Sequence, residues 1–283
     1  MESIFLNEKN CLLDINELIE KLHLFSDDIV FLGGSLIEGR VNHYSKGMGN
    51  IYSDLDVFIV RSNTFFNNTH FTYSEKYKKT DFTSLNSLGI DIEIYSEEFI
   101  NNLFLQINKA NFAPQVRIAN AIKIPEGITE YSVNSFINRF INAIPIYNVD
   151  KYKKLKMKLN LENWIKYQKY SIENSIENIF DDIQGNVHAK NYDVSVLCSR
   201  TAFLQLIKYL CFSLGDLSDR EKWLPQKLNN IVKEHVEYKE ILEFYNQLFF
   251  MKLETNRQKG DISMDTVSFI RRKIETISME ELL

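Results

Sequence analysis

The sequence predicts an α/β (α+β) domain with a small mixed sheet, followed by an all-α domain built as a helical bundle. Up to residue 125, the hydrophobic pattern alternates between the period of helices and the period of strands. After Pro125, nearly every segment has the 3.6-residue period of amphipathic helices, with few breaks. We therefore expect a first domain of residues 1–125 and a helical domain of residues 126–283.

In the first domain, a helix is predicted over residues 12–24, where leucines and isoleucines recur at helical spacing. Residues 29–32 and 55–60 are short apolar runs typical of buried strands. Residues 90–95 alternate apolar and acidic side chains, which predicts a strand with one face toward the core. Ser96 follows as the N-cap of a further helix.

The second half reads as a series of helices separated by polar or glycine-containing breaks. The clearest breaks are residues 184–191 and 215–225. The predicted helices cover residues 131–147, 151–183, 192–214, 226–256 and 263–281.

Composition limits the classes of function. With 283 residues, of which 45% are hydrophobic and 25% charged, the chain can bury a core in each of two domains. A net charge of −5 disfavours charge-driven nucleic-acid binding. The three cysteines lack disulfide or zinc spacing, and we find neither a signal peptide nor 18 consecutive apolar residues. We expect a cytoplasmic protein without a membrane segment.

Three carboxylates lie in or beside the predicted strands. Asp54 and Asp56 flank Leu55, so strand alternation directs both carboxylates to one face. Asp91 belongs to another strand of the same character. If the two strands are neighbours, the three carboxylates converge, and their mutual repulsion favours a bound cation. Oxygen ligands of this kind suit Mg²⁺.

A glycine-serine turn stands at the end of the preceding strand. Gly33 and Gly34 allow the backbone to approach a ligand closely, and Ser35, opening a helix, adds a hydroxyl and free N–H groups for an anion. A phosphate-binding turn ahead of a carboxylate cluster suits metal-assisted transfer of a phosphoryl or nucleotidyl group.

These three motifs together resemble those of the DNA polymerase β-like nucleotidyltransferase superfamily. Its pattern is a glycine-serine turn, an Asp-x-Asp strand and a later strand with an acid between apolar residues. Within the superfamily, the Gly-Asn-x-x-Ser-Asp sequence at residues 49–54 and the Ser-Glu-Glu at residues 96–98 are similar to bacterial kanamycin-type and lincosamide-type nucleotidyltransferases. The motifs cover residues 28–100, and over the helical half the resemblance is one of architecture.

The resemblance implies a role for each matching residue. Asp54, Asp56 and Asp91 would be catalytic and would hold Mg²⁺, with two ions expected. Contacts with the nucleotide, for which ATP is the expected donor, would come from Gly33, Gly34, Ser35, Asn50 and Ser53. Glu93 is the alternative third carboxylate, and Asp91 is preferred for its spacing to residues 96–98. In kanamycin-type enzymes a glutamate of the helical domain is the general base, and Glu173 is the candidate here.

The sequence leaves the acceptor open. We expect transfer of a nucleoside monophosphate to a hydroxyl of a small molecule, such as an antibiotic, with release of pyrophosphate. Transfer to a protein or a tRNA is the alternative within the same superfamily, and a non-catalytic nucleotide-binding protein is the alternative outside enzymes. The related antibiotic enzymes include homodimers. An apparent insertion at residues 40–46 is either a flap over the substrate or a decoration.

Overall fold

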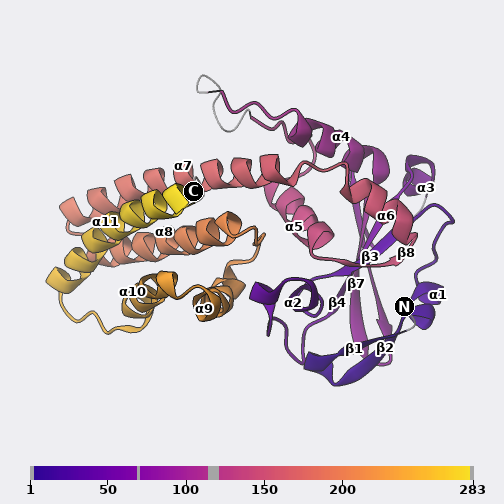
Figure 1. Ribbon diagram of the computed structural model, residues 1–283, viewed down its shortest axis with the longest axis horizontal. Helices are drawn as coiled ribbons and strands as arrows, with labels where there is room; N and C mark the ends of the chain where they lie inside the picture. The colour runs from indigo at the N-terminus through magenta and orange to yellow at the C-terminus, as the bar shows by residue number, and fades with distance from the viewer. Residues whose placement is uncertain (1–2, 69–70, 114–120, 281–283) are drawn as a thin grey trace. The chain divides into compact units, whose positions relative to one another are not determined.

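The computed structural model describes residues 3–68, 71–113 and 121–280. The chain forms two compact units, Met1–Asn163 and Trp164–Leu283. The first unit contains a mixed sheet with helices, and the second is helical, so the predicted fold class is confirmed (Figure 1). Each unit is described by itself.

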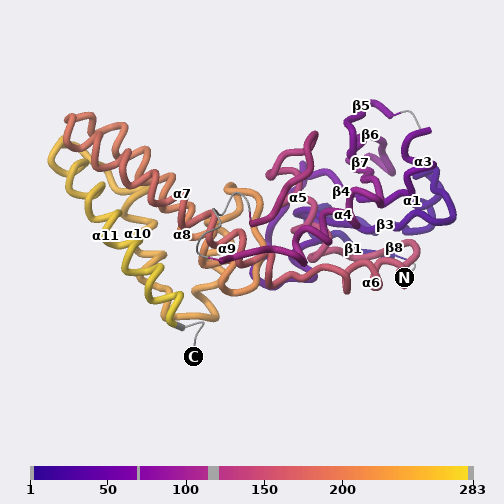
Figure 2. Tube along the Cα trace, turned by 90° about the horizontal axis from the view of Figure 1, so that it is seen from above, coloured from indigo at the N-terminus to yellow at the C-terminus, as the bar shows by residue number. Residues whose placement is uncertain are grey.

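The first unit is organised around one six-stranded sheet. Its strand order is β5-β6-β7-β4-β3-β8, which can be followed in Figure 2. β4 and β7 are parallel, whereas the other neighbouring strands are antiparallel. The strands are β3 (Ile29–Gly33), β4 (Leu55–Arg61), β5 (Tyr73–Ser74), β6 (Lys78–Leu85), β7 (Leu88–Ser96) and β8 (Ile144–Tyr147).

One face of the sheet packs against a small N-terminal layer. Strands β1 (Ser3–Leu6) and β2 (Cys11–Asp14) pair with each other and precede helix α1 (Ile15–Lys21) (Figure 1). Their apolar side chains share a core with every second residue of the central strands, Val57 and Ile92 among them. The helix predicted from residue 12 begins only at Ile15, because its first residues pair with β1 and the Asp14 carboxylate accepts the first free helical N–H groups.

The opposite face packs against helices α4 (Glu97–Asn108), α5 (Glu130–Ile141) and α6 (Val149–Lys156) (Figure 1). An aromatic cluster fills this layer. Phe31 stacks on Phe58 with ring centroids 5.3 Å apart, and Phe140 meets Phe31 edge-on at 5.5 Å. The Ser96 hydroxyl accepts a hydrogen bond from the Phe99 N–H, which confirms the predicted N-cap of α4.

The first unit continues beyond residue 125, where the sequence suggested a boundary. The segment 131–147, expected as one helix, forms α5 and then β8, which pairs with β3 at the edge of the sheet. Pro145 lies inside this segment. Proline disrupts a helix interior but is tolerated in an edge strand, because no neighbour needs its missing N–H. Two further helices of the first unit are short, α2 (Glu38–Val41) and α3 (Asn63–Asn68).

The second unit consists of helices, as predicted. They are α7 (Leu161–His188), whose first residues belong to the first unit, α8 (Tyr192–Ser213), α9 (Leu224–Glu234), α10 (Lys239–Phe250) and α11 (Asn256–Glu280). The helix expected over residues 226–256 is interrupted by a 3₁₀ turn, Val236–Tyr238, which separates α9 from α10. α8 and α11 pack against each other along their length (Figure 2).

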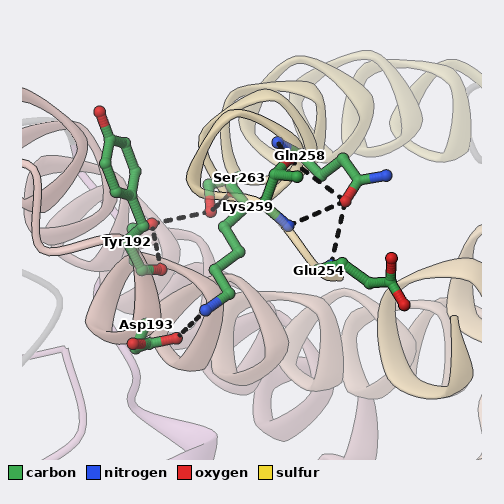
Figure 3. A network of polar contacts seen from close by, with 8 residues as sticks. Tyr192, Asp193, Glu254, Gln258, Lys259 and Ser263 are labelled. Carbon is green, nitrogen blue, oxygen red and sulfur yellow. Dashed lines mark hydrogen bonds and ion pairs between the residues drawn. The ribbon is translucent and has the colours of Figure 1, made fainter. Parts of the chain in front are cut away.

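The start of α11 is fixed by polar contacts, shown in Figure 3. The Thr255 hydroxyl accepts from the Gln258 N–H at 3.2 Å, while the Gln258 side chain accepts from the Thr255 N–H at 3.0 Å. This reciprocal capping box satisfies N–H groups that a helix start leaves unpaired. Lys259 then bonds Asp193 on α8 at 2.6 Å, so the capped end is tied to its neighbour (Figure 3).

Among the residues that the structure describes, one helix, α8, is long and apolar enough to cross a membrane, judged by length and composition. The sequence pattern suggested none. More than half of its most apolar window, 56%, is buried within the protein, and helices that form a core commonly pass the same test.

A buried ion pair joins the two central antiparallel strands of the first unit. Asp28, just before β3, receives hydrogen bonds from the Arg61 guanidinium at the end of β4, at 2.6 Å for Nη2 and 3.0 Å for Nε. Both side chains are only 1% exposed. The Asp28 carboxylate also accepts from the Phe25 N–H. A carboxylate in this position depends on its partner, since an unpaired buried charge is costly.

We predict that Arg61→Ala lowers the free energy of unfolding by about 3–5 kcal/mol, because Asp28 would remain buried without its counter-charge. Urea denaturation followed by circular dichroism measures the change. The matched control is Lys151→Ala, which removes the exposed Lys151–Asp27 ion pair and is expected to cost less than about 1 kcal/mol. Equal losses in both variants would contradict the structural role assigned to the buried pair.

Candidate functional site

The strand register places the motif residues side by side. Gly33 on β3 pairs with Asp56 on β4, and Asp56 pairs with Asp91 on the parallel strand β7. Residues opposite one another in a sheet project from the same face. Alternation adds Asp54 to that face, while Leu55 and Val57 are buried on the other. We call the face that bears Asp54, Asp56 and Asp91 the carboxylate face.

Two glycines make room for these carboxylates. Gly34 has φ +75°, and a Cβ built there would lie 2.6 Å from Cγ of Asp56 and overlap its carboxylate. A Cβ on Gly89 of β7 would similarly overlap a carboxylate oxygen of Asp54. The carboxylates therefore lie directly against backbone, where any larger residue would displace them. The contact of Gly34 with nucleotide stays a prediction, and Gly89 was not singled out by the sequence.

The carboxylate face carries crowded negative charge. Burial raises the pKa of Asp56 from 3.8 to about 7, and the negative charges of Asp91, Glu93 and Glu38 add to this shift. The positive charge of Arg139 opposes it. Burial also raises the pKa of Asp91, with further contributions from Asp54 and Glu93. A cation at this point would relieve the repulsion that raises both pKa values.

The donors on this face fit a hard divalent cation. Asp54, Asp56 and Asp91 offer only carboxylate oxygens, which Mg²⁺ prefers. The side chains as placed in the described part of the chain do not form a closed set of three or more acidic, histidine or cysteine ligands. Mg²⁺ usually keeps waters and takes substrate phosphates as ligands, so a site completed by substrate suits this donor set.

The register distinguishes Asp91 from Glu93. Asp91 lies opposite Asp56, whereas Glu93 lies opposite Phe58, two residue pairs further from Asp54. Glu93 is also engaged already. It forms an ion pair with Lys78 at 2.7 Å and accepts a hydrogen bond from the Tyr95 hydroxyl at 2.8 Å. These contacts give Glu93 a structural role and favour Asp91 as the third carboxylate.

The glycine-serine turn is built differently from the sequence expectation. Ser35 was expected to open a helix, but it lies in a turn whose closing N–H groups, from Ile37 and Glu38, donate to the Gly34 carbonyl at 2.9 Å. The helix that follows, α2, is a single turn starting at Glu38. Ser35 itself is partly exposed, beside the backbone of Gly34 that contacts Asp56.

The loop that leads to Asp54 packs on this turn. A Cβ on Gly49, where φ is +86°, would lie 3.0 Å from the Ser35 carbonyl oxygen. Asn50 and Ser53, the other two residues expected to contact nucleotide, form a closed turn in which the Asn50 N–H donates to the Ser53 hydroxyl at 3.0 Å. They therefore brace the entry to Asp54 and lie next to the serine turn.

Arg139 is a residue of this site that sequence reasoning missed. It lies on α5, and the atoms nearest a Cβ on Gly33 would be Cβ and Cγ of Arg139, at 3.0 and 3.2 Å. Its guanidinium lies over the Phe58 ring and donates to the Ser135 hydroxyl at 2.9 Å. Gly33 thus allows a buried cation to approach Asp56. Periodicity marks Arg139 only as one charge on a helix.

Two further predicted features belong to other segments of the chain. Glu173 lies on α7 in the second unit, so its role as general base stays a prediction. The segment at residues 40–46 is compact. It completes α2 and forms a 3₁₀ turn, His43–Ser45, whose backbone lies so close to Gly39 that a Cβ there would be 2.7 Å from the Ser45 carbonyl oxygen.

Comparison with known proteins gives distant similarity to solved structures. No family model matches the sequence, and neither does any curated protein. Among solved structures, the chain is similar to a nucleotidyltransferase-like protein from Exiguobacterium sibiricum, with 11% sequence identity and a TM-score of 0.47. The match covers 95% of this chain and 76% of that protein.

The pKa of Asp56 predicts how stability depends on pH. Because the folded protein holds the Asp56 proton up to about pH 7 and the unfolded chain only to about pH 4, folding stability falls as pH rises through this range. We predict that Asp56→Asn removes this fall. Without divalent cations, the variant should melt several degrees above wild type at pH 8 and near wild type at pH 4. The gain in the free energy of unfolding at pH 8 is at most about 4 kcal/mol.

Thermal melts followed by circular dichroism between pH 4 and pH 8 measure this difference. Asp265→Asn, at an exposed position of α11, reports the effect of removing a carboxylate from the surface. Millimolar Mg²⁺ should raise the melting temperature of wild type at pH 8 more than that of Asp56→Asn. A melting-temperature difference between wild type and Asp56→Asn that stays constant with pH would contradict the raised pKa of Asp56.

We also predict that Gly34→Ala destabilises the protein more than Gly127→Ala. Both glycines have positive φ, which costs an alanine about 1–2 kcal/mol, but only at Gly34 would the new methyl group displace a carboxylate. At Gly127 the nearest atom to a new methyl group, Cδ of Lys76, is at an ordinary 3.4 Å. Urea denaturation measures the loss in the free energy of unfolding for each variant. Equal losses would contradict the close packing of Gly34 on Asp56.

Proposed function

We propose that this protein is a Mg²⁺-dependent nucleotidyltransferase, which transfers a nucleoside monophosphate from an NTP to a hydroxyl of a small-molecule acceptor and releases pyrophosphate. The observation that carries the proposal is the alignment of Gly33, Asp56 and Asp91 on three adjacent strands, with the Gly34 backbone against Asp56. This alignment places the glycine-serine turn beside a carboxylate cluster, and nucleotidyl transfer requires both a phosphate-binding group and a metal-binding group.

Each part has its own task in the proposed reaction. The turn at Gly34 and Ser35 binds the β- and γ-phosphates through backbone N–H groups and the serine hydroxyl. Asp54, Asp56 and Asp91 would hold two Mg²⁺ ions, which when bound neutralise charge on the attacked and leaving phosphates. Arg139, beside Gly33, offsets part of the negative charge of Asp56 when the site is empty.

The chemical step forms one bond and breaks one. The acceptor hydroxyl oxygen attacks the α-phosphorus, and a carboxylate accepts the hydroxyl proton. The bond between the α-phosphorus and its bridging oxygen breaks, and pyrophosphate leaves with the electron pair. Glu173 of the helical unit remains the candidate for this carboxylate.

The donor and acceptor follow from the family resemblance. We propose ATP as the donor and a hydroxylated small molecule, such as an aminoglycoside- or lincosamide-like antibiotic, as the acceptor. The negative net charge and the acidic face support this class over an anionic tRNA. Cys11, Cys198 and Cys211 are free thiols, in keeping with an enzyme of the reducing cytoplasm.

Labelled nucleotides test the proposal and separate its alternatives. The protein is incubated with each α-labelled NTP, Mg²⁺ and a cell extract, and the extract is then fractionated by size. We expect label in small molecules. Label in protein or in RNA would identify another class of acceptor for the same chemistry. Retained NTP binding without any transfer would indicate a non-catalytic nucleotide-binding protein instead of an enzyme.

The third carboxylate gives a sharper test. We predict that Asp91→Asn lowers pyrophosphate release at least about 100-fold, because it removes a metal ligand opposite Asp56. Glu93→Gln should retain activity within about tenfold, since that side chain is engaged by Lys78 and Tyr95. Circular dichroism controls for folding. The reverse order of the two losses would transfer the third-carboxylate role to Glu93.

A further inference from the structure

Two exposed aromatic side chains continue the carboxylate face beyond Asp91. Phe82 on β6 pairs directly with Asp91, so its ring projects from the same face on the adjacent strand. Tyr73 on β5 pairs with Thr80, two residues from Phe82 on β6, and thus reaches the same face. The two rings meet edge-to-face with centroids 6.3 Å apart. Figure 2 shows β5, β6 and β7 in succession.

Both rings are open to solvent. Phe82 is 53% exposed and Tyr73 is 65% exposed, although large aromatic residues are usually among the most buried side chains. The alternate residues of β6 on the other face behave normally, with Lys79 and Leu85 buried. A pair of exposed rings in edge-to-face contact offers apolar surface close to Asp91.

The order of groups across the sheet indicates which substrate reaches this surface. From β3 to β6, the row runs from Gly33 through Asp56 and Asp91 to Phe82. In phosphoryl-type transfer, the attacking and leaving oxygens lie on opposite sides of the phosphorus, roughly in line. With the pyrophosphate at the glycine turn and the α-phosphorus at Asp56, the attacking hydroxyl comes from the Asp91 side. The group next to that hydroxyl would then lie over Phe82.

Charge narrows the chemistry of that group. The acidic neighbours of Phe82 on this face are Asp91 and Glu93, and the nearby cation Lys78 is already paired with Glu93 at 2.7 Å. An anionic chain such as RNA would meet repulsion here, whereas a neutral or cationic ring would not. Aromatic faces attract cations and pack well against flat ring surfaces.

We infer that Phe82 and Tyr73 form an acceptor subsite that binds a neutral or cationic ring of a hydroxylated small molecule, with its reactive hydroxyl directed at Asp91. This inference rests on the proposed nucleotidyl transfer. Phe82 is the main contact, because it is the ring paired with Asp91, and Tyr73 holds it edge-on. Binding of a ligand gives a role to two exposed rings at a sheet edge, a position where exposed apolar residues otherwise favour aggregation.

Binding and turnover are tested separately, with kanamycin A and lincomycin as the ring probes. Isothermal titration of the full chain with each probe measures binding, and pyrophosphate release with ATP and Mg²⁺ measures transfer. We expect Phe82→Ala to weaken binding of at least one probe, and to raise its KM, by about tenfold, as loss of a stacking ring does. The affinity for ATP should stay within about twofold.

Two further variants separate the subsite from a purely structural role. Phe82→Tyr keeps a ring and should bind the probe nearly as wild type does. Phe5→Ala removes a ring of similar exposure, 45%, from β1 in the other sheet, and should leave acceptor binding unchanged. A structural role would lower the melting temperature of Phe82→Ala without changing the KM for the acceptor relative to ATP, and that result would overturn the subsite.

The remaining outcomes are equally decisive. Failure of both probes to bind wild type, or equal binding of each probe by wild type and Phe82→Ala, overturns the subsite while leaving the transfer reaction to stand on the carboxylates. Binding of tRNA that depends on Phe82 overturns the class of acceptor. Ring binding that depends on Phe82, without pyrophosphate release from any NTP, overturns the proposed function and the acceptor role with it.

Discussion

The parallel pairing of β4 with β7 is the constraint on which the site depends. It sets Asp56 against Asp91, and with Asp54 it concentrates three negative charges on one face of a sheet whose other face is a hydrophobic core. Such a face is unfavourable alone, as the raised pKa of Asp56 indicates. It persists because Gly34 and Gly89 leave space for the carboxylates and because Arg139 supplies a nearby positive charge.

Arg139 also shows why the site requires sequence far from its motifs. Its position on α5 lies some hundred residues after the glycine turn, and its approach depends on the missing side chain of Gly33. The aromatic cluster around Phe31 and Phe140 fixes α5 on the sheet, so core packing positions a polar group of the site. Helix α5 therefore contributes both to the hydrophobic core, through Phe140, and to the candidate site, through Arg139.

Local chemistry explains what could be predicted from sequence. The alternation around Asp54 and Asp56, the acidic strand with Asp91 and the serine cap at Ser96 are properties of a few neighbouring residues, and the structure has them as expected. Strand order and the approach of Arg139 are tertiary properties that one sequence does not encode locally. Pro145 is an intermediate case, because it argues against a helix without revealing that β8 would join β3. The pairing of Phe82 with Asp91 likewise became visible only through the register.

The position of β8 late in the sequence of the first unit limits where the chain can be truncated. Because β8 covers the outer side of β3, a polypeptide ended at residue 125 would keep Asp54, Asp56, Asp91 and the glycine-serine turn, yet it would leave the hydrogen-bonding groups of β3 open. Exposed strand borders of this kind recruit other chains. A fragment chosen by motif content alone would thus self-associate, and the smallest autonomous piece must extend through α6.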